Sequence, residues 1–146
     1  MRAVVPRRRD DRASVLVLVP AALLIVLVMA SIVVDMSLVH LRRRQAHDLA
    51  AGAANDAVTA AADEGSLRAG SYRVDPDRAQ QVVERIVAAS DLAPDGAVPP
   101  TVRVTGDSVA VEVSLHADYI FAGVIPGTPD GATVTATASA TAVAGP

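Results

Sequence analysis

Ser114, His116 and Asp118 are the residues whose types come closest to a hydrolytic constellation. A serine, an imidazole and a carboxylate can act together as nucleophile, general base and orienting group. Here they are spaced two apart in an alternating segment, so a strand would place all three on one face, together with Glu112. A catalytic triad does not require that spacing, and the polar face of a sheet explains it. We therefore infer no active site from these residues.

His40 and His47 lie seven residues apart, about two turns along one face of a helix. Metal ligands on a helix are usually spaced i,i+4, with a third ligand close by. The sequence also has no cysteine, no glycine-rich phosphate loop and no nucleophile elbow. We therefore expect solvated histidines, no metal or cofactor, no small-molecule substrate and a protein that is not an enzyme.

Composition narrows the classes of partner. The 146 residues are enough for one modest domain, and Ala and Val dominate while aromatic residues make up 2%. The net charge of -3 gives no electrostatic reason to expect nucleic acid as a partner. The absence of cysteine excludes disulfides.

The apolar run from Ala13 to Val34 contains no charged residue. A helix of this length spans roughly 30 Å, the thickness of a bilayer's hydrocarbon core. Pro20 falls in its second turn, where it can kink the helix or be absorbed by local adjustment. More arginines precede the run than follow it, which favours a cytoplasmic N-terminus. Those before it are Arg2, Arg7, Arg8, Arg9 and Arg12, and those after it are Arg42, Arg43 and Arg44.

A cleaved signal peptide is the alternative to an anchor. Its apolar region would be roughly 7–15 residues long and would end at a small-residue cleavage site. The run here is longer, and Val28-Met29-Ala30 matches such a site poorly. A buried helix of a soluble protein is disfavoured, because nothing else in the chain could cover its apolar surface. We therefore expect an uncleaved, single-pass anchor in the cell membrane, with the lipid bilayer as a partner.

Asp35 is the first charged residue after the apolar run. It can be the interfacial carboxylate at which the span ends. It can also pair with a cation on another subunit, because charges near a membrane tend to be functional. We therefore name Asp35 as a candidate assembly contact.

The helical pattern continues beyond Asp35, because residues 36–62 contain no proline and only one glycine, Gly52. Alanine has the highest helix propensity, so this extension should be helical, and Gly65 is the expected C-cap. Small residues recur along one face and permit close contact with another element. These candidate assembly contacts are Ala46, Ala50, Ala53, Ala57 and Ala61. They can pack on the chain's own C-terminal part or on a partner, and both roles stay open.

After a polar link, Asp75 and Pro76 predict a second helix, with Asp75 as N-cap and Pro76 at the first helical position. The segment APDGAVPP, residues 93–100, ends it. A period of two then predicts three strands, around residues 102–104, 109–115 and 133–142, with a turn at Gly106-Asp107. The expected fold class is α+β and membrane-anchored. A long N-terminal transmembrane helix extends outside the membrane, followed by a second short helix and a small antiparallel sheet of about three strands, as in a pilin.

The pattern resembles the TadE/TadG-like proteins of Flp (tight-adherence) pilus assembly, particularly short actinobacterial forms. The resemblance begins at DRASVLVLVPAALL and continues through VVDMSLV, RRRQAHDLAAGAANDAVTAA and the final TVTATASATA. It covers most of the chain in pattern, through motifs of low complexity. It implies a component of a pilus or of its secretion machinery that contacts other such components.

One departure from the family bears on processing. Prepilin-like TadE members carry a glycine at the cleavage position and a glutamate at the fifth mature residue, where this chain has Ala13 and Leu18. The resemblance therefore implies an uncleaved, TadG-like anchor. The expected organisation is a cytoplasmic basic tail (1–12), a transmembrane helix (13–34), an extracytoplasmic extension of the helix (35–64) and a small α+β domain (65–146). The alternative function is a membrane-anchored extracytoplasmic binding module unrelated to pili.

Overall fold

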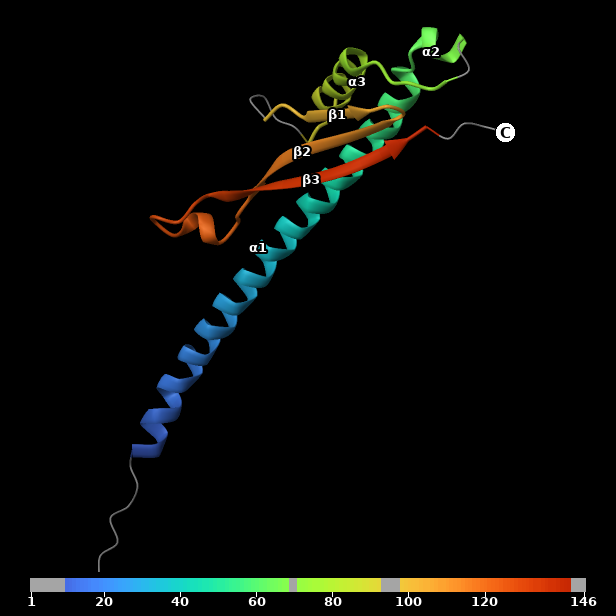
Figure 1. Cartoon of the computed structure of the whole chain (residues 1–146). Coiled ribbons are helices and arrows are strands. Elements are labelled where there is room, and N and C mark those ends of the chain that lie inside the picture. Colours follow the sequence, from blue (N-terminus) through green and yellow to red (C-terminus); the bar gives the residue numbers. More distant parts are fainter. Residues whose placement is uncertain (1–9, 69–70, 93–97, 143–146) are drawn as a thin grey trace, which may run out of the picture.

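One long helix carries a small α+β unit at its C-terminal end (Figure 1). The computed structural model describes residues 10–68, 71–92 and 98–142, so residues 1–9 of the basic tail and residues 93–97 of the predicted break lie outside the described residues. The elements are α1 (Asp10–Ala60), α2 (Glu64–Arg68), α3 (Pro76–Ala88), β1 (Thr101–Thr105), β2 (Ser108–Asp118), the 3-10 turn η1 (Ala122–Val124) and β3 (Gly131–Thr141). The predicted α+β class is confirmed, with a long apolar N-terminal helix, a short helix and a three-stranded antiparallel sheet.

The N-terminal half of α1 is an uncovered apolar rod. Large side chains along residues 18–34 are exposed, and α1 runs through Pro20 without ending. The hydroxyl groups of Ser31 and Ser37 each donate to a carbonyl of the preceding turn at 2.7 Å, which satisfies them within the helix. Among the described helices, α1 is the one long and apolar enough to cross a membrane.

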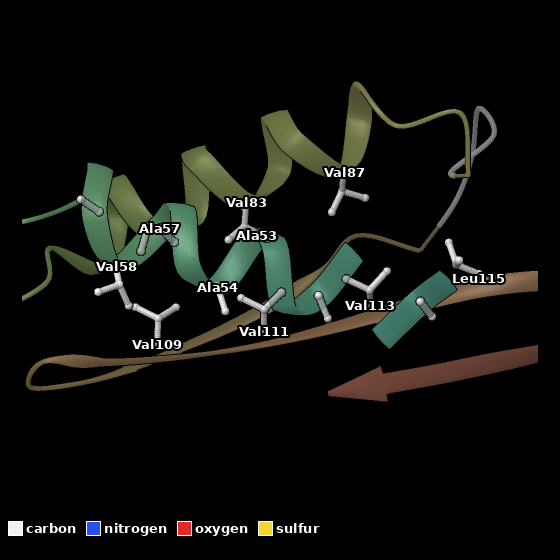
Figure 2. Close-up of a cluster of buried hydrophobic side chains, with 14 of the residues drawn as sticks. Ala53, Ala54, Ala57, Val58, Val83, Val87, Val109, Val111, Val113 and Leu115 are labelled. Carbon is white, nitrogen blue, oxygen red and sulfur yellow. The ribbon is translucent and has the colours of Figure 1, made fainter. Parts of the chain in front are cut away.

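The C-terminal half of α1 is covered by the sheet and by α3. α1 lies against β2 and β3, and α3 lies against α1 and β1 (Figure 1). Alanines of α1 and valines of α3 and β2 meet in one cluster (Figure 2). The largest fully buried side chains are Val83, Val109, Val111 and Val113. Such small side chains let the helix lie close to the strands, so a chain almost without aromatic residues still forms a core.

The end of α1 differs from the prediction. The helix ends at Ala60, and Gly65 lies inside α2 instead of capping α1. Asp63 begins the new helix, because its carboxylate accepts the N–H groups of Gly65 at 3.4 Å and Ser66 at 3.0 Å. The expected C-cap was therefore wrong, since Asp63, two residues before Gly65, caps the start of a new helix instead. A bridge between Ala62 and Val74 returns the chain toward α3.

α3 begins as predicted. The Asp75 side chain accepts the N–H groups of Asp77 at 2.9 Å and Arg78 at 3.2 Å, and Pro76 occupies the first turn. These contacts satisfy amides that have no partner within the helix. The buried face of α3 consists of Ala79, Val83 and Val87.

The sheet has the order β1-β2-β3, with both pairs antiparallel. Gly106 and Asp107 form the turn between β1 and β2, which confirms the predicted turn. Gly106 has a φ of 64°, which glycine adopts without strain and which two-residue hairpins require. β3 begins at Gly131, before the predicted start at Thr133, and pairs with β2 along its whole length.

Candidate functional site

Asp35 binds the loop between β2 and β3. Its Oδ1 atom accepts hydrogen bonds from the backbone N–H groups of Ile120 at 2.9 Å and Phe121 at 3.2 Å. Its Oδ2 atom accepts one from the Ala122 N–H at 2.8 Å. Asp35 is buried, with 6% of its surface exposed. The carboxylate therefore holds the loop against α1 at the position where the apolar run ends.

This geometry holds Asp35 in its ionised form. Burial acts to raise the pKa of the carboxyl group, because the charged form loses contact with water. The hydrogen bonds from Ala122, Phe121 and Ile120 stabilise the charge and outweigh burial, so the pKa of Asp35 lies below its ordinary value. At neutral pH the contact consists of charge-assisted hydrogen bonds. From the sequence, Asp35 was expected to end the span or to pair with a cation on another subunit. The structure adds a third role, a contact with the β2–β3 loop of the same chain.

The loop from Tyr119 to Asp130 is folded on itself. At its base the Tyr119 N–H donates to the Asp130 carbonyl at 2.8 Å. In η1 the N–H groups of Val124 and Ile125 donate to carbonyls one turn earlier, at 3.2 and 3.1 Å. The Thr128 N–H donates to the Ile125 carbonyl at 3.2 Å, and the Thr128 hydroxyl group lies within hydrogen-bond reach of the Ala122 and Ile125 carbonyls. Most amides of the loop are thus bonded within the chain.

The outer surface of the loop is apolar. Its large exposed side chains are Ile120 at 55%, Phe121 at 48%, Val124 at 79% and Ile125 at 57%. Residues 119–129 contain no charged side chain, and Tyr119 and Phe121 are two of the three aromatic residues in the chain. Sequence reasoning missed this segment, because it shows neither the helical period nor strict alternation. The lack of charged residues and the two aromatic residues in this segment could have identified it.

A basic groove of about 670 Å³ lies between α1 and β3. It is lined by His40, Arg43, Arg44, His47, Asp48, Thr135, Ala136 and Thr137. His40 and His47 are exposed and line the same groove, as their predicted spacing along one helix face requires. Guanidinium and imidazole groups offer hydrogen-bond donors to an anion. Within the described residues, no group of three His, Asp or Glu side chains could hold a metal ion.

The five candidate alanines are fully buried inside the chain. Ala46, Ala50, Ala53, Ala57 and Ala61 are each 0% exposed and belong to the core cluster. The sequence left open whether these alanines pack on the chain's own C-terminal part or on a partner, and in the structure they pack on the chain itself. In this arrangement they offer no surface to another subunit, because the sheet and α3 cover them.

The triad-like residues lie on the outer face of β2. The His116 Nε2 atom is 3.5 Å from the Asp118 Oδ1 atom, and both side chains are largely exposed. The Ser114 hydroxyl group is bonded across the sheet to the Thr135 hydroxyl group at 2.9 Å. The serine is thus engaged by β3, and the three residues form part of the polar sheet face that their spacing predicted. That face continues on β3 through Thr133, Thr135, Thr137, Ser139 and Thr141, all of which are exposed.

No family model matches the chain, and neither curated proteins nor solved structures give a match. The chain's own geometry and the resemblance in its sequence pattern are therefore the observations that bear on its function.

Proposed function

We propose that this chain is a non-enzymatic, single-pass membrane protein that acts as a TadE/TadG-like component of Flp pilus assembly or of the associated secretion machinery. The observation that carries the proposal is the continuity of α1. One helix joins an uncovered apolar segment, residues 18–34, to the core of a small domain. The resemblance in sequence pattern supports the family and the pilus.

The apolar segment of α1 is unsuited to water. Burying one large aliphatic side chain is worth about 1.5–3 kcal/mol, and residues 18–34 expose a succession of them. No described part of the chain covers these side chains. A bilayer provides the apolar surroundings that the segment requires, which supports a single-pass anchor.

The outer half of α1 supports a holding role. From Asp35 to Ala60 the helix rises roughly 38 Å at about 1.5 Å per residue. The sheet packs directly on this helix, so the domain has a fixed position relative to the membrane span. A protein built in this way can hold a pilus subunit or an assembly component at a set height above the membrane.

The proposed orientation places the N-terminus in the cytoplasm and the α+β domain outside, on the basis of the arginine distribution. The chain has no cysteine, so single cysteines are clean reporters. A cysteine replacing the exposed Ser139 should react with an impermeant maleimide in intact cells, and one replacing Arg2 should react only after lysis. The reverse pattern would overturn the orientation.

A crosslinking experiment tests the assembly role. Asp56 lies on the exposed face of α1, whereas Ala53 is buried one turn earlier. A photo-crosslinker at position 56 should capture another membrane-anchored component encoded beside a Flp pilus operon, and deletion of the gene should reduce surface pili. A crosslinker at position 53 is the matched control and should reach only the chain's own core. Unchanged piliation, with no capture from position 56, would refute the proposal.

The alternative is a membrane-anchored binding module unrelated to pili. The basic groove between α1 and β3 favours it, because Arg43 and Arg44 could receive an anionic group of a partner. Replacing both arginines with glutamine distinguishes the two functions. Loss of partner binding with normal piliation would favour the module, and loss of piliation would favour the pilus component.

A further inference from the structure

The β2–β3 loop carries an apolar surface that the proposed assembly role does not use. We propose that residues 120–125 of this loop enter the interfacial layer of the bilayer beside α1 and dock the outer domain onto the membrane surface. The ligand is the lipid bilayer itself. The inference rests on the membrane anchoring proposed above, and the experiment below separates the failure of one from the failure of the other.

The position of the loop follows from Asp35. This residue comes directly after the uncharged run, so it lies at the boundary of the hydrocarbon core if residues 13–34 span the bilayer. Asp35 is bonded to the N–H groups of three successive loop residues, 120–122, which fixes the loop at the same height. Figure 1 shows the loop beside α1, where the helix leaves the sheet and continues alone. The loop therefore lies at the level of the lipid headgroups.

The exposed side chains of the loop suit that level. Tyrosine is enriched at membrane interfaces, and phenylalanine is common on the apolar face of interfacial segments. The half-buried Tyr119 and the exposed Phe121 are two of the three aromatic residues in the chain. The branched side chains of Ile120, Val124 and Ile125 add an apolar surface that is more than half exposed. Interfacial segments commonly bury such side chains about 5–10 Å into the boundary between headgroups and acyl chains.

Most backbone N–H groups of the loop also have hydrogen-bond partners, as an apolar environment requires. An amide without a hydrogen-bond partner is costly in a bilayer, because no water can replace the bond. The N–H groups of residues 119–122 all donate within the chain, as do those of Val124 and Ile125. When the segment leaves bulk water, most of its backbone N–H groups therefore keep a hydrogen-bond partner.

Continuity with the span favours lipid over a protein as the occupant of this surface. The apolar surface of α1 reaches Val34 and Met36, on either side of Asp35, and both are exposed. The loop extends this apolar surface sideways at the end of the span, and residues 119–129 add no charge to it. A bilayer that receives residues 13–34 brings its interface to the loop without any further partner.

Single tryptophans test the docking, because the chain has none of its own. We would place Phe121→Trp in the full-length protein, reconstituted in phosphatidylcholine vesicles with and without bromine on the acyl chains. Leu24→Trp, in the uncovered part of α1, is the positive control, and Val98→Trp, exposed in the outer domain, is the negative control. Tryptophan at position 121 should emit at shorter wavelength than at position 98 and should lose most of its intensity in brominated lipid.

The outcomes are distinct. If Leu24→Trp is quenched and Phe121→Trp is not, the loop does not dock and the anchor stands. If neither is quenched, the membrane anchoring fails and the inference fails with it. A short-wavelength emission at position 121 without quenching would mean that a second copy or another protein covers the loop, which also overturns the inference. Adding Val124→Glu to Phe121→Trp should reduce the quenching, because Val124 is the most exposed of these side chains and its replacement disturbs no packing.

Discussion

The Asp35 Oδ2 atom and the Ala122 backbone N are 2.8 Å apart, although 87 residues separate them in the sequence. Asp35 ends the apolar part of α1, and Ala122 begins η1 in the loop that joins β2 to β3. One carboxylate thus connects the end of the apolar part of α1 with the far end of the sheet. The N–H groups of Ile120 and Phe121, which precede Ala122 in the loop, donate to the Asp35 Oδ1 atom.

Removing this carboxylate should release the loop. In Asp35→Ala all three bonded amides lose their acceptor, and in Asp35→Asn the new amide group places a donor against the Ala122 N–H. We expect faster hydrogen exchange at residues 120–122 in both variants, with Asp35→Ala the faster, and little change at Val111 in the core. Asp48→Ala, on the exposed face of α1, is the matched control. Unchanged exchange at residues 120–122 would show that the loop is held by other contacts.

The same carboxylate predicts a pH dependence. In the folded chain the pKa of Asp35 is lowered from the ordinary aspartate value of 3.8. The unfolded state therefore binds the proton first, and the stabilisation is complete above about pH 5 and is lost as pH falls below about 4. The Ala122 amide resonance should accordingly stay constant between about pH 5 and 8 and shift only in acid. A transition that survives in Asp35→Asn would show that this carboxylate is not the group that moves the Ala122 resonance.

The buried alanines predict a steric effect. Ala57 is fully buried in the core cluster, while Thr59 is exposed and its hydroxyl group donates to the Asn55 carbonyl at 3.1 Å. Ala57→Leu should lower the free energy of unfolding of the α+β unit by about 1–3 kcal/mol, because the extra carbons must displace the sheet or α3. Thr59→Leu should change it by less than about 0.5 kcal/mol, as exposed substitutions usually do. Equal, small losses in denaturant titrations would mean that α1 does not pack as described.

Local signals in the sequence accounted for much of the fold. The Asp75-Pro76 pair starts α3, Gly106 makes the turn between β1 and β2, and the alternation of Val with polar residues gives the strands. Each of these depends on neighbours within a few residues, which a sequence displays directly. The end of α1 was misjudged, because Asp63 and Gly65 both carry helix-boundary signals and only the structure shows that the Asp63 cap forms.

The candidate site was harder to predict than the fold. The residue Asp35 was singled out, but its partners in the loop were not, because no local rule links positions separated by 85 residues or more. The apolar loop itself has no period that would mark it. The alanines illustrate a different limit, since a small-residue stripe has the same sequence whether it meets its own sheet or another subunit.

Processing can be tested by mass. The absence of glycine at Ala13 and of glutamate at Leu18 predicts that the prepilin peptidase does not cleave this chain. The intact mass of protein extracted from membranes should therefore include residues 13–34. A mature N-terminus at Ser14 would restore the cleaved-pilin interpretation, and one at Ser31 would make the protein secreted.

Gly131 begins β3 opposite Asp118. A Cβ atom at this position would lie 2.5 Å from the Ala117 carbonyl oxygen and 2.5 Å from the His116 Nε2 atom. The imidazole can move aside, but the carbonyl belongs to the paired strand and cannot move without shifting β2. Gly131→Ala should therefore cost about 1–3 kcal/mol of unfolding free energy, through the strain of overpacking.

Gly52→Ala is the matched control for that substitution, because a Cβ atom on Gly52 meets nothing within 4 Å. Gly52 lies in the interior of α1, where alanine is favoured over glycine by roughly 0.5–1 kcal/mol. The two substitutions add the same methyl group, yet thermal unfolding should shift in opposite directions. For a domain of about 60–100 residues each kcal/mol corresponds to about 4–8 °C, so the difference is measurable. A Gly131→Ala variant as stable as the parent would show that β3 can start without the close approach of Gly131 to Ala117.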